Sequence, residues 1–400
     1  MKAFVLEGRG KVSWVEKEAP VLKEEHGVLI EPLLLAPCTS DVHTIWQGSP
    51  KKKNLTLGHE CVGKIIKTGS AVKDFSVGEV VAVSAITPNW DDPEVRENEA
   101  HAGYPFSGHL LGKSIDGAFQ DCFYLPHADK NCGKIPEGLS LEDALLCTDV
   151  LQTGFTAAEE GEVKAGNTVC VLGTGAIGLA AIFAAQCLGA RHIFAVGSRE
   201  ENKRLAESFG TEDCPVEVLD YKELKAELPE GKHPLANSTN SSVVNRVLER
   251  TGGKGVDRVL VCGGDEYALC MASDMVRYGT GIVSNVAYFA AEEGMVEEEL
   301  SGQPFYYRVG GKEVEKKAID GILLPKFSLG KGMAGKRFVF SLSRGGRTHL
   351  EKVMQTCLAK HFHPREMFTK SYHGLENIEA ALYDMKSRRA IKVLVYTDLA

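Results

Sequence analysis

The chain has 400 residues, of which 44% are hydrophobic and 25% charged, and its formal net charge is −8. This length allows two domains with separate cores, and an acidic chain without a basic patch is not expected to bind nucleic acid, because phosphate neutralisation needs clustered Lys and Arg. No apolar run approaches the ~20 residues of a membrane helix, and the N-terminus has no signal-peptide apolar region, so no membrane association is expected.

The eleven cysteines are scattered and contain no CxxC pair. This spacing is typical neither of a disulfide framework nor of a four-cysteine zinc site. We therefore expect reduced thiols in a cytoplasmic protein, most of them filling the core.

The first ~150 residues are predicted to be rich in strands. VLIEPLLLAP (28–37), VGKIIKTGSAV (62–72) and VGEVVAVSAI (77–86) alternate or run apolar over the length of a strand. Between them lie residue types that a core strand does not need, in the segments PCTSDVHT (37–44) and GHE (58–60).

These segments suggest a catalytic zinc site, which takes three protein ligands and keeps one open position. Cys38 and His59 can supply two ligands, and Asp149 in TDVLQTGF can supply the third. Thiolate, neutral imidazole and carboxylate would make the site formally neutral, which favours loss of a proton from a bound alcohol. Glu60 could be a fourth ligand that is displaced when substrate binds. The alternative for Cys38 and His59, taken singly, is an ordinary place in the core.

Ser40 and His43 follow Cys38 at two and five residues. A hydroxyl near the metal and an imidazole near the surface could carry the alcohol proton out of a dry pocket. The alternative is a loop hydroxyl and a surface histidine without a role.

After Gly166, short apolar strands alternate with helices, which predicts a parallel sheet covered on both faces. The segment GTGAIG directly follows the strand TVCVL and begins a helix, as a dinucleotide-binding turn does. The expected contacts to the cofactor come from six consecutive residues: Gly173, Thr174, Gly175, Ala176, Ile177 and Gly178. The alternative is a glycine-rich turn that binds no ligand.

The second strand of this unit, HIFAV, ends in Gly197, Ser198 and Arg199, where an NAD-binding site normally has an acid. Without a carboxylate there, a ribose 2′-phosphate can bind, with Ser198 donating a hydrogen bond and Arg199 a charged fork. Glu200 and Glu201 fall too late and are expected to face solvent. The local chemistry favours NADP over NAD.

Two stretches, 223–242 and 290–307, are predicted to be surface insertions without assignable chemistry. The last ~60 residues end in AIKVLVYTDL (390–399), which we predict to be a strand that returns to the first domain.

The motifs together resemble one family. GHECVGKIIKTGSAV (58–72) fits the zinc alcohol dehydrogenase signature, and the whole chain resembles the medium-chain zinc dehydrogenases. PCTSDVHT, AITPNW, TDVLQTGF, GTGAIG, VGSR, LDY and GKGVDRV resemble the NADP-dependent secondary-alcohol (isopropanol) dehydrogenases, a microbial group.

The resemblance implies an α/β protein in which a β-rich GroES-like catalytic domain joins a doubly wound Rossmann domain. The catalytic domain would comprise 1–153 completed by 341–400, the NADP-binding domain 154–340, and the assembly a homotetramer. It implies one catalytic zinc per subunit on Cys38, His59 and Asp149, with Glu60 exchangeable and no structural zinc. Ser40 and His43 match the proton-relay positions. Further matches are cofactor contacts: Gly197, Ser198, Arg199, Tyr221, Tyr288 and Lys392.

Some positions depart from that group. Ala287 stands where a polar cofactor contact is expected, and His109 where a large aromatic is expected near the substrate. Ala85, Ile86 and Trp90 are further candidates for the pocket wall. The predicted function is hydride transfer between NADP(H) and a secondary alcohol or ketone. The alternatives are a polyol or aldehyde reductase on the same scaffold, and a non-catalytic nucleotide-binding relative.

Overall fold

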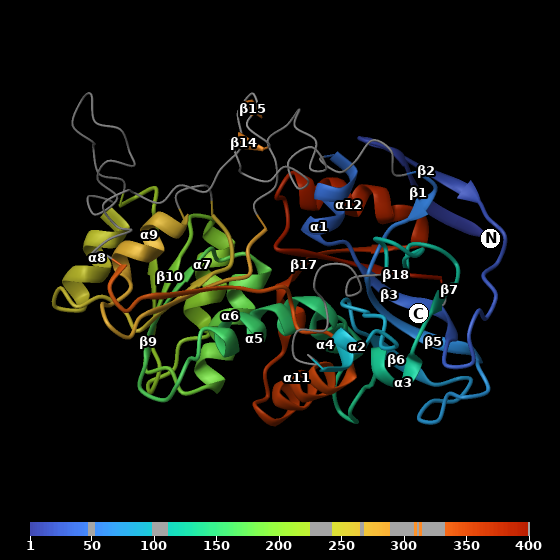
Figure 1. Cartoon of the computed structure of the whole chain (residues 1–400), viewed down its shortest axis with the longest axis horizontal. Coiled ribbons are helices and arrows are strands. Elements are labelled where there is room, and N and C mark those ends of the chain that lie inside the picture. The colour runs from blue at the N-terminus through green and yellow to red at the C-terminus, as the bar shows by residue number, and fades with distance from the viewer. Residues whose placement is uncertain are drawn as a thin grey trace.

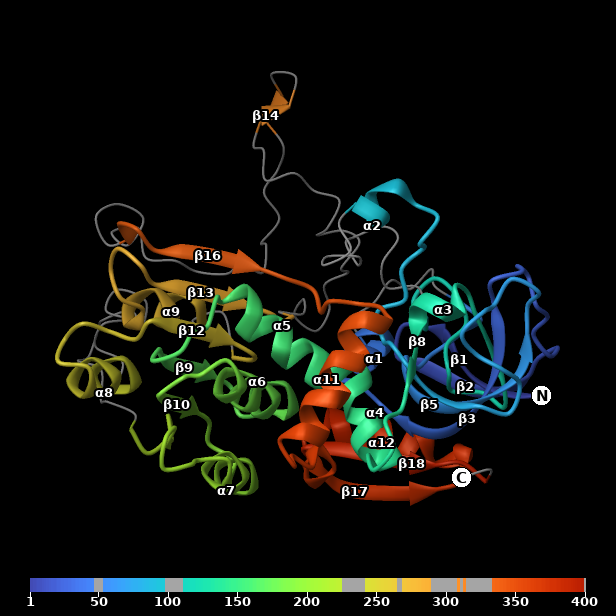
Figure 2. The same cartoon turned by 90° about the horizontal axis from the view of Figure 1, so that it is seen from below.

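The computed structural model of the chain describes residues 1–46, 53–97, 111–224, 242–264, 268–288, 308–309, 312–313 and 333–398. Its helices and strands form two halves that lie side by side, each built around one large sheet (Figures 1 and 2). His109, the predicted insertion 290–307 and nearly all of 223–242 lie outside the described residues.

The first half contains a seven-stranded sheet in the order β17-β18-β3-β5-β6-β8, with β7 paired to β3. The bounds are β3 (Val28–Ala36), β5 (Glu60–Thr68), β6 (Val80–Val83), β7 (Phe123–Leu125), β8 (Cys132–Lys134), β17 (Phe368–His373) and β18 (Lys392–Tyr396). A smaller sheet, β2-β1-β4, is made of β1 (Lys2–Gly8), β2 (Lys11–Glu16) and β4 (Leu55–Thr56).

The C-terminal strand β18 pairs antiparallel with β3, where Val395 lies opposite Leu35. Both chain ends therefore lie in the same half of the molecule (Figure 1). This confirms the prediction that the last strand returns to the N-terminal part of the chain.

The second half contains a six-stranded parallel sheet in the order β11-β10-β9-β12-β13-β16. The bounds are β9 (Thr168–Leu172), β10 (His192–Val196), β11 (Val216–Leu219), β12 (Arg258–Val261), β13 (Ile282–Asn285) and β16 (Arg337–Phe340). The strand order reverses between β9 and β12, which is where open parallel sheets bind dinucleotides.

Helices cover both faces of this sheet, so its central strands are buried apolar runs. On one face, α5 (Gln152–Glu160) and α6 (Ala176–Cys187) pack on residues such as Val171 and Ala195. On the other, α8 (Ser242–Arg250) and α9 (Ala268–Met275) pack on Val259 and Phe194. The predicted α/β architecture with a doubly wound sheet is confirmed.

The remaining elements complete the described chain. They are α1 (Thr39–Trp46), α2 (Pro93–Glu97), α3 (Ala128–Asn131), α4 (Leu141–Leu146), η2 (Cys147–Leu151), α7 (Glu200–Ser208), β14 (Arg308–Val309), β15 (Lys312–Glu313), α11 (Arg347–Ala359), η6 (Pro364–Met367), η7 (Leu375–Asn377) and α12 (Ile378–Lys386).

One apolar core joins the two halves. It extends from Val62 on β5 through Leu146 and Leu151 to Leu179 on α6 and Val353 on α11. The continuous stretch α4–η2–α5 therefore crosses between the sheets in a fixed position (Figure 2). Within the described ranges, no helix combines the length and the apolar character that crossing a membrane requires.

Candidate metal and dinucleotide sites

Three separate segments bring the predicted metal ligands together. Cys38 follows β3, His59 directly precedes β5, and Glu60 is the first residue of β5. Because β3 and β5 are antiparallel neighbours with Ala36 opposite Glu60, the end of one strand lies beside the beginning of the other. Asp149 comes from η2, a π-helical turn, and such turns occur often at functional sites.

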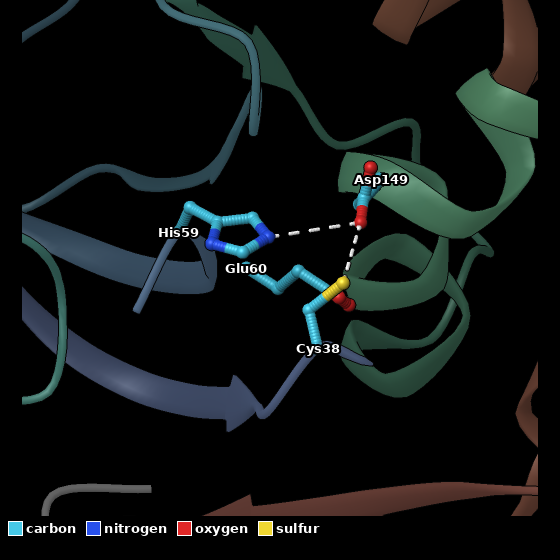
Figure 3. Close-up of side chains that lie close together, drawn as sticks. All are labelled: Cys38, His59, Glu60 and Asp149. Carbon is cyan, nitrogen blue, oxygen red and sulfur yellow. Dashed lines mark hydrogen bonds and ion pairs between the residues drawn. The ribbon is translucent and has the colours of Figure 1, made fainter. Parts of the chain in front are cut away.

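The side chains of this metal-ligand group point toward one another (Figure 3). Asp149 Oδ2 lies 3.4 Å from Cys38 Sγ and 3.8 Å from His59 Nε2. One ligand atom from each of Cys38, His59, Glu60 and Asp149 lies within 4.8 Å of the others, close enough to share one ion. His59 and Glu60 are buried, and within the described part of the chain Glu60 Oε2 has no hydrogen-bond partner.

The electrostatics of the metal-ligand group favour a cation. Burial raises the pKa of the Cys38 thiol, and the Asp149 carboxylate adds to this shift. Burial lowers the pKa of His59, but Asp41 and Asp149 outweigh it and hold that pKa well above the usual value. Burial also raises the pKa of Glu60 to about 7, although Lys392 opposes the shift. Because their pKa values are raised, these side chains keep their protons more readily, and a metal ion that binds here would displace those protons.

Asp41 is a functional residue that the sequence analysis missed. It is completely buried, accepts a hydrogen bond from the Cys38 amide at 3.0 Å, and lies 3.4 Å from His59 Nδ1. Burial raises its pKa, but the neighbouring His59 outweighs this and lowers the pKa to about 2. A carboxylate on the outer nitrogen leaves Nε2 of His59 to face the metal. The position of Asp41, three residues after Cys38, was the sequence signal from which its place at this site could have been predicted.

Lys392 contacts the metal-ligand group. Its side chain is buried, and its ammonium forms an ion pair with Glu60 Oε1. The sequence analysis assigned Lys392 to the cofactor, and that assignment stays a prediction.

The two proton-relay candidates, Ser40 and His43, lie on α1, which begins directly after the predicted ligand Cys38. Ser40 Oγ is 3.4 Å from His59 Nε2. The His43 ring centroid is 5.3 Å from that of Tyr288, a half-exposed residue just after β13. Lys113, which the sequence analysis did not consider, donates to the Ser40 carbonyl at 3.3 Å and also contacts Thr44 Oγ1.

The glycine-rich turn has the geometry of a phosphate-binding turn. Gly173 has a φ of 93°, and a Cβ on Gly178 would lie 1.7 Å from the Gly173 carbonyl oxygen. By contrast, a Cβ on Gly175 would meet no atom within 4 Å, so the backbone there is open to a ligand. The N-terminus of α6 follows directly and presents free backbone N–H groups.

The remaining predicted cofactor residues gather at the ends of β10 and β11. A Cβ on Gly197 would lie 1.9 Å from Thr174 Oγ1, so this glycine permits the close approach of the two turns. Arg199 is the N-cap residue of α7, and its Nη1 donates to the Arg388 carbonyl at 3.4 Å. Tyr221, two residues after β11, is half exposed. Glu200 is 63% exposed and pairs with Lys203 and Arg204.

The residues suggested for the pocket wall are buried. Ala85 and Ile86 follow β6, and the Ala85 amide donates to the Thr148 carbonyl beside Asp149. Trp90 packs on Val95, and its indole N–H donates to Asn131 at 2.8 Å.

Ala287, which stands where a polar cofactor contact was expected, packs against the core beside β13. All eleven cysteines lie in the described ranges, and none of them forms a disulfide there.

Comparisons with known proteins agree with this geometry. The family model described as alcohol dehydrogenase GroES-like domain matches residues 24–137, and the one described as zinc-binding dehydrogenase matches residues 176–307. The NADP-dependent isopropanol dehydrogenase of Entamoeba histolytica is 36% identical over 98% of this chain and 93% of its own. That of Clostridium beijerinckii is 34% identical over 97% of both chains.

Solved structures show the same fold. An alcohol dehydrogenase from a Thermus species superimposes with a TM-score of 0.75 at 24% identity, covering 99% of this chain and 100% of that chain. The 2R,3R-butanediol dehydrogenase of Bacillus subtilis gives a TM-score of 0.73 at 21% identity, covering 99% of both chains. The chain therefore belongs to the zinc-binding alcohol dehydrogenases that carry a GroES-like domain.

Proposed function

We propose that this protein is a zinc-dependent oxidoreductase that transfers a hydride between NADP(H) and the carbon of a secondary alcohol or ketone. The observation that carries the proposal is the convergence of Cys38, His59 and Asp149 from three chain segments onto one point. The substrate class and the cofactor are supported by the relatives named NADP-dependent isopropanol dehydrogenase, which match this chain over nearly its full length.

The donor set fits zinc. A thiol, an imidazole and a carboxylate are zinc ligands, and three of them leave a position for substrate. Bound zinc would supply Lewis acidity toward the substrate oxygen. Glu60 can take part as an exchangeable ligand, since its Oε2 is buried without a partner while Oε1 stays paired with Lys392.

Ser40 and His43 move the proton. Ser40 Oγ lies beside His59 and can accept the proton of the substrate hydroxyl, while the partly buried His43 can release it toward solvent. Asp41 holds His59 and the Cys38 amide in place, so the group needs little rearrangement when the reaction occurs.

The ends of β9 and β10 would hold the cofactor. The Gly175 backbone and the α6 N-terminus would receive the pyrophosphate, with Thr174, Ala176 and Ile177 completing the turn. Ser198, Arg199 and Tyr221 would select the 2′-phosphate, and Tyr288, beside His43, would contact the cofactor.

Three further points belong to this proposal. The catalytic domain comprises 1–153 and 341–400, and the NADP-binding domain comprises 154–340.

The enzyme is a homotetramer, for which the β16 edge offers a surface: Phe340 and Leu342 are 58% and 41% exposed. The enzyme works in the cytoplasm, in keeping with its free cysteines.

The test is the initial rate of 2-propanol oxidation by zinc-loaded protein with NADP⁺ and, separately, with NAD⁺. We expect a clearly faster rate with NADP⁺, and we expect Cys38→Ser to fold but to retain neither catalytic zinc nor turnover. An unchanged rate for Cys38→Ser would refute the metal assignment. Activity on polyols or aldehydes but not on 2-propanol would refute the substrate class and keep the mechanism.

A further inference from the structure

A buried polar network lies directly behind the metal ligand Asp149, and its centre is Gln152. This residue is completely buried at the beginning of α5. Its Nε2 donates to the Thr148 carbonyl at 2.8 Å and to Ser84 Oγ at 3.3 Å. Its Oε1 lies 3.3 Å from His349 Nδ1. Ser84 in turn accepts from the Gly346 amide at 3.1 Å, so three distant chain segments meet at one amide.

The contacts of Gln152 bear on the orientation of Asp149. The Thr148 carbonyl belongs to the peptide bond that leads into Asp149, and it also accepts from the Ala85 amide at 3.0 Å. With two donors, this carbonyl has no freedom to rotate, so the backbone direction at Asp149 is fixed within the π-helical turn.

The carboxylate of Asp149 is fixed in the same way at its other end. Thr153 Oγ1 donates to Asp149 Oδ1 at 3.2 Å. Oδ2 is thereby left to face Cys38 Sγ at 3.4 Å and His59 Nε2 at 3.8 Å. The backbone contact from Gln152 and the side-chain contact from Thr153 together set which oxygen faces the metal.

The outer end of the network holds Gln152 in a single orientation. Both N–H bonds of its amide are used, so its Oε1 must accept and His349 Nδ1 must carry the proton. His349 Nε2 lies 3.4 Å from Glu159, a carboxylate that Lys352 and Arg344 each contact at 2.8 Å. Rotating the Gln152 amide would leave buried donors and acceptors unpaired, which is costly in a low-dielectric interior.

We propose that Gln152, held by His349, is a positioning residue that fixes the direction in which Asp149 presents its carboxylate to the metal. The proposal rests on the proposed zinc site. Partners of metal ligands typically change metal affinity 10- to 100-fold when they are removed. Because Gln152 lies buried behind Asp149 and contacts Thr148, Ser84 and His349, its effect should be visible at the metal itself, without turnover.

The test replaces the metal with Co²⁺, whose visible absorption reports ligand geometry. In wild type we expect a thiolate-to-cobalt charge-transfer band and a d–d spectrum of a distorted tetrahedral site. Gln152→Met keeps the length of the side chain but removes the amide. We expect this variant to shift the d–d bands and to lose Co²⁺ to a chelator at least about tenfold more readily.

Asn131→Leu is the matched control. Asn131 is equally buried, and its amide also donates to a backbone carbonyl, that of Pro126 at 2.9 Å, and accepts from Trp90. We expect a similar loss of thermal stability but an unchanged cobalt spectrum. His349→Leu removes only the outer partner, so it should shift the spectrum in the same direction by less, and it carries the test if Gln152→Met does not fold.

The outcomes separate the two proposals. If wild type shows no thiolate–cobalt band, the metal site itself is refuted. If wild type shows the band but Gln152→Met and His349→Leu keep its spectrum and chelator resistance, the positioning role is refuted and Gln152 is only structural.

Discussion

The buried ion pair between Lys392 and Glu60 yields the sharpest prediction for stability. Their side chains are 3% and 0% exposed, and Glu60 Oε2 has no hydrogen-bond partner among the described residues. Lys392→Met keeps most of the volume of the side chain and removes its charge. The variant therefore leaves the buried Glu60 carboxyl, whose pKa burial raises to about 7, without this counter-ion.

The size of the effect follows from two arguments. Two unit charges about 4 Å apart attract each other by about 4 kcal/mol at an effective dielectric constant of about 20. Breaking a buried pair by removing one partner costs about 3–5 kcal/mol, because the remaining group must either stay charged without solvation or take up a proton. We therefore expect Lys392→Met to lower the free energy of unfolding by about 3–5 kcal/mol.

The assay is urea unfolding of metal-free protein, combined with NADPH binding followed by its fluorescence. The double variant Glu60→Gln/Lys392→Met removes both charges and should recover most of the lost stability, since neither group is then a buried ion. NADPH affinity should stay within about twofold of wild type in both proteins, a difference of less than about 0.5 kcal/mol. Unchanged stability together with weakened NADPH binding would refute this reasoning and make Lys392 a cofactor contact.

Three further predictions concern the cofactor turns and one largely buried carboxylate. Arg199→Ala should raise the KM for NADP⁺ at least about tenfold and spare NAD⁺, since a charge-assisted hydrogen bond contributes about 1.5–3 kcal/mol; equal losses for both would contradict the 2′-phosphate role. Gly175→Ala should fold normally but bind NADPH weakly, whereas Gly178→Ala should be unstable, because its methyl would overlap the Gly173 carbonyl; thermal melts and binding isotherms separate the two. Burial raises the pKa of Glu159, but His349 and Lys352 outweigh it and lower the pKa to about 2. The ionised Glu159 carboxylate stabilises the folded protein fully above about pH 4.5, and this stabilisation is lost as the pH falls toward 2. The difference in the free energy of unfolding between wild type and Glu159→Gln, about 2–3 kcal/mol at pH 7, should therefore disappear in acid.

Local patterns predicted the second half of the molecule well. The run TVCVL followed by GTGAIG could be read because strand, turn and helix are contiguous in sequence, and their roles depend on local backbone geometry. The return of β18 to the first sheet was also predicted, from the apolar run in AIKVLVYTDL. The structure brings the predicted ligands Cys38 and His59 together, because Cys38 follows one strand and His59 directly precedes the antiparallel neighbour of that strand.

Local sequence patterns could not predict contacts that depend on tertiary packing. Lys392 lies 332 residues from Glu60 in the chain, so no spacing rule reveals their ion pair. Gln152 and His349 are also distant in sequence, and each alone is an unremarkable polar residue. The π-helical turn adds a residue to a helix and changes which side chain faces the metal, and this change leaves no periodic signal.

The position of Asp149 explains why a ligand from this segment suits a dehydrogenase. The first half supplies Cys38 and His59 next to the ends of neighbouring strands, but the glycine-rich turn belongs to the second half. Asp149 precedes α5, and α5 packs on α6 so closely that a Cβ on Gly154 would lie 2.5 Å from the Ala180 side chain. The helix α6 begins at the glycine-rich turn. One tightly packed path therefore runs from the proposed metal ligand to the proposed pyrophosphate site. It would hold a bound metal and the nicotinamide at a set distance, on which hydride transfer depends.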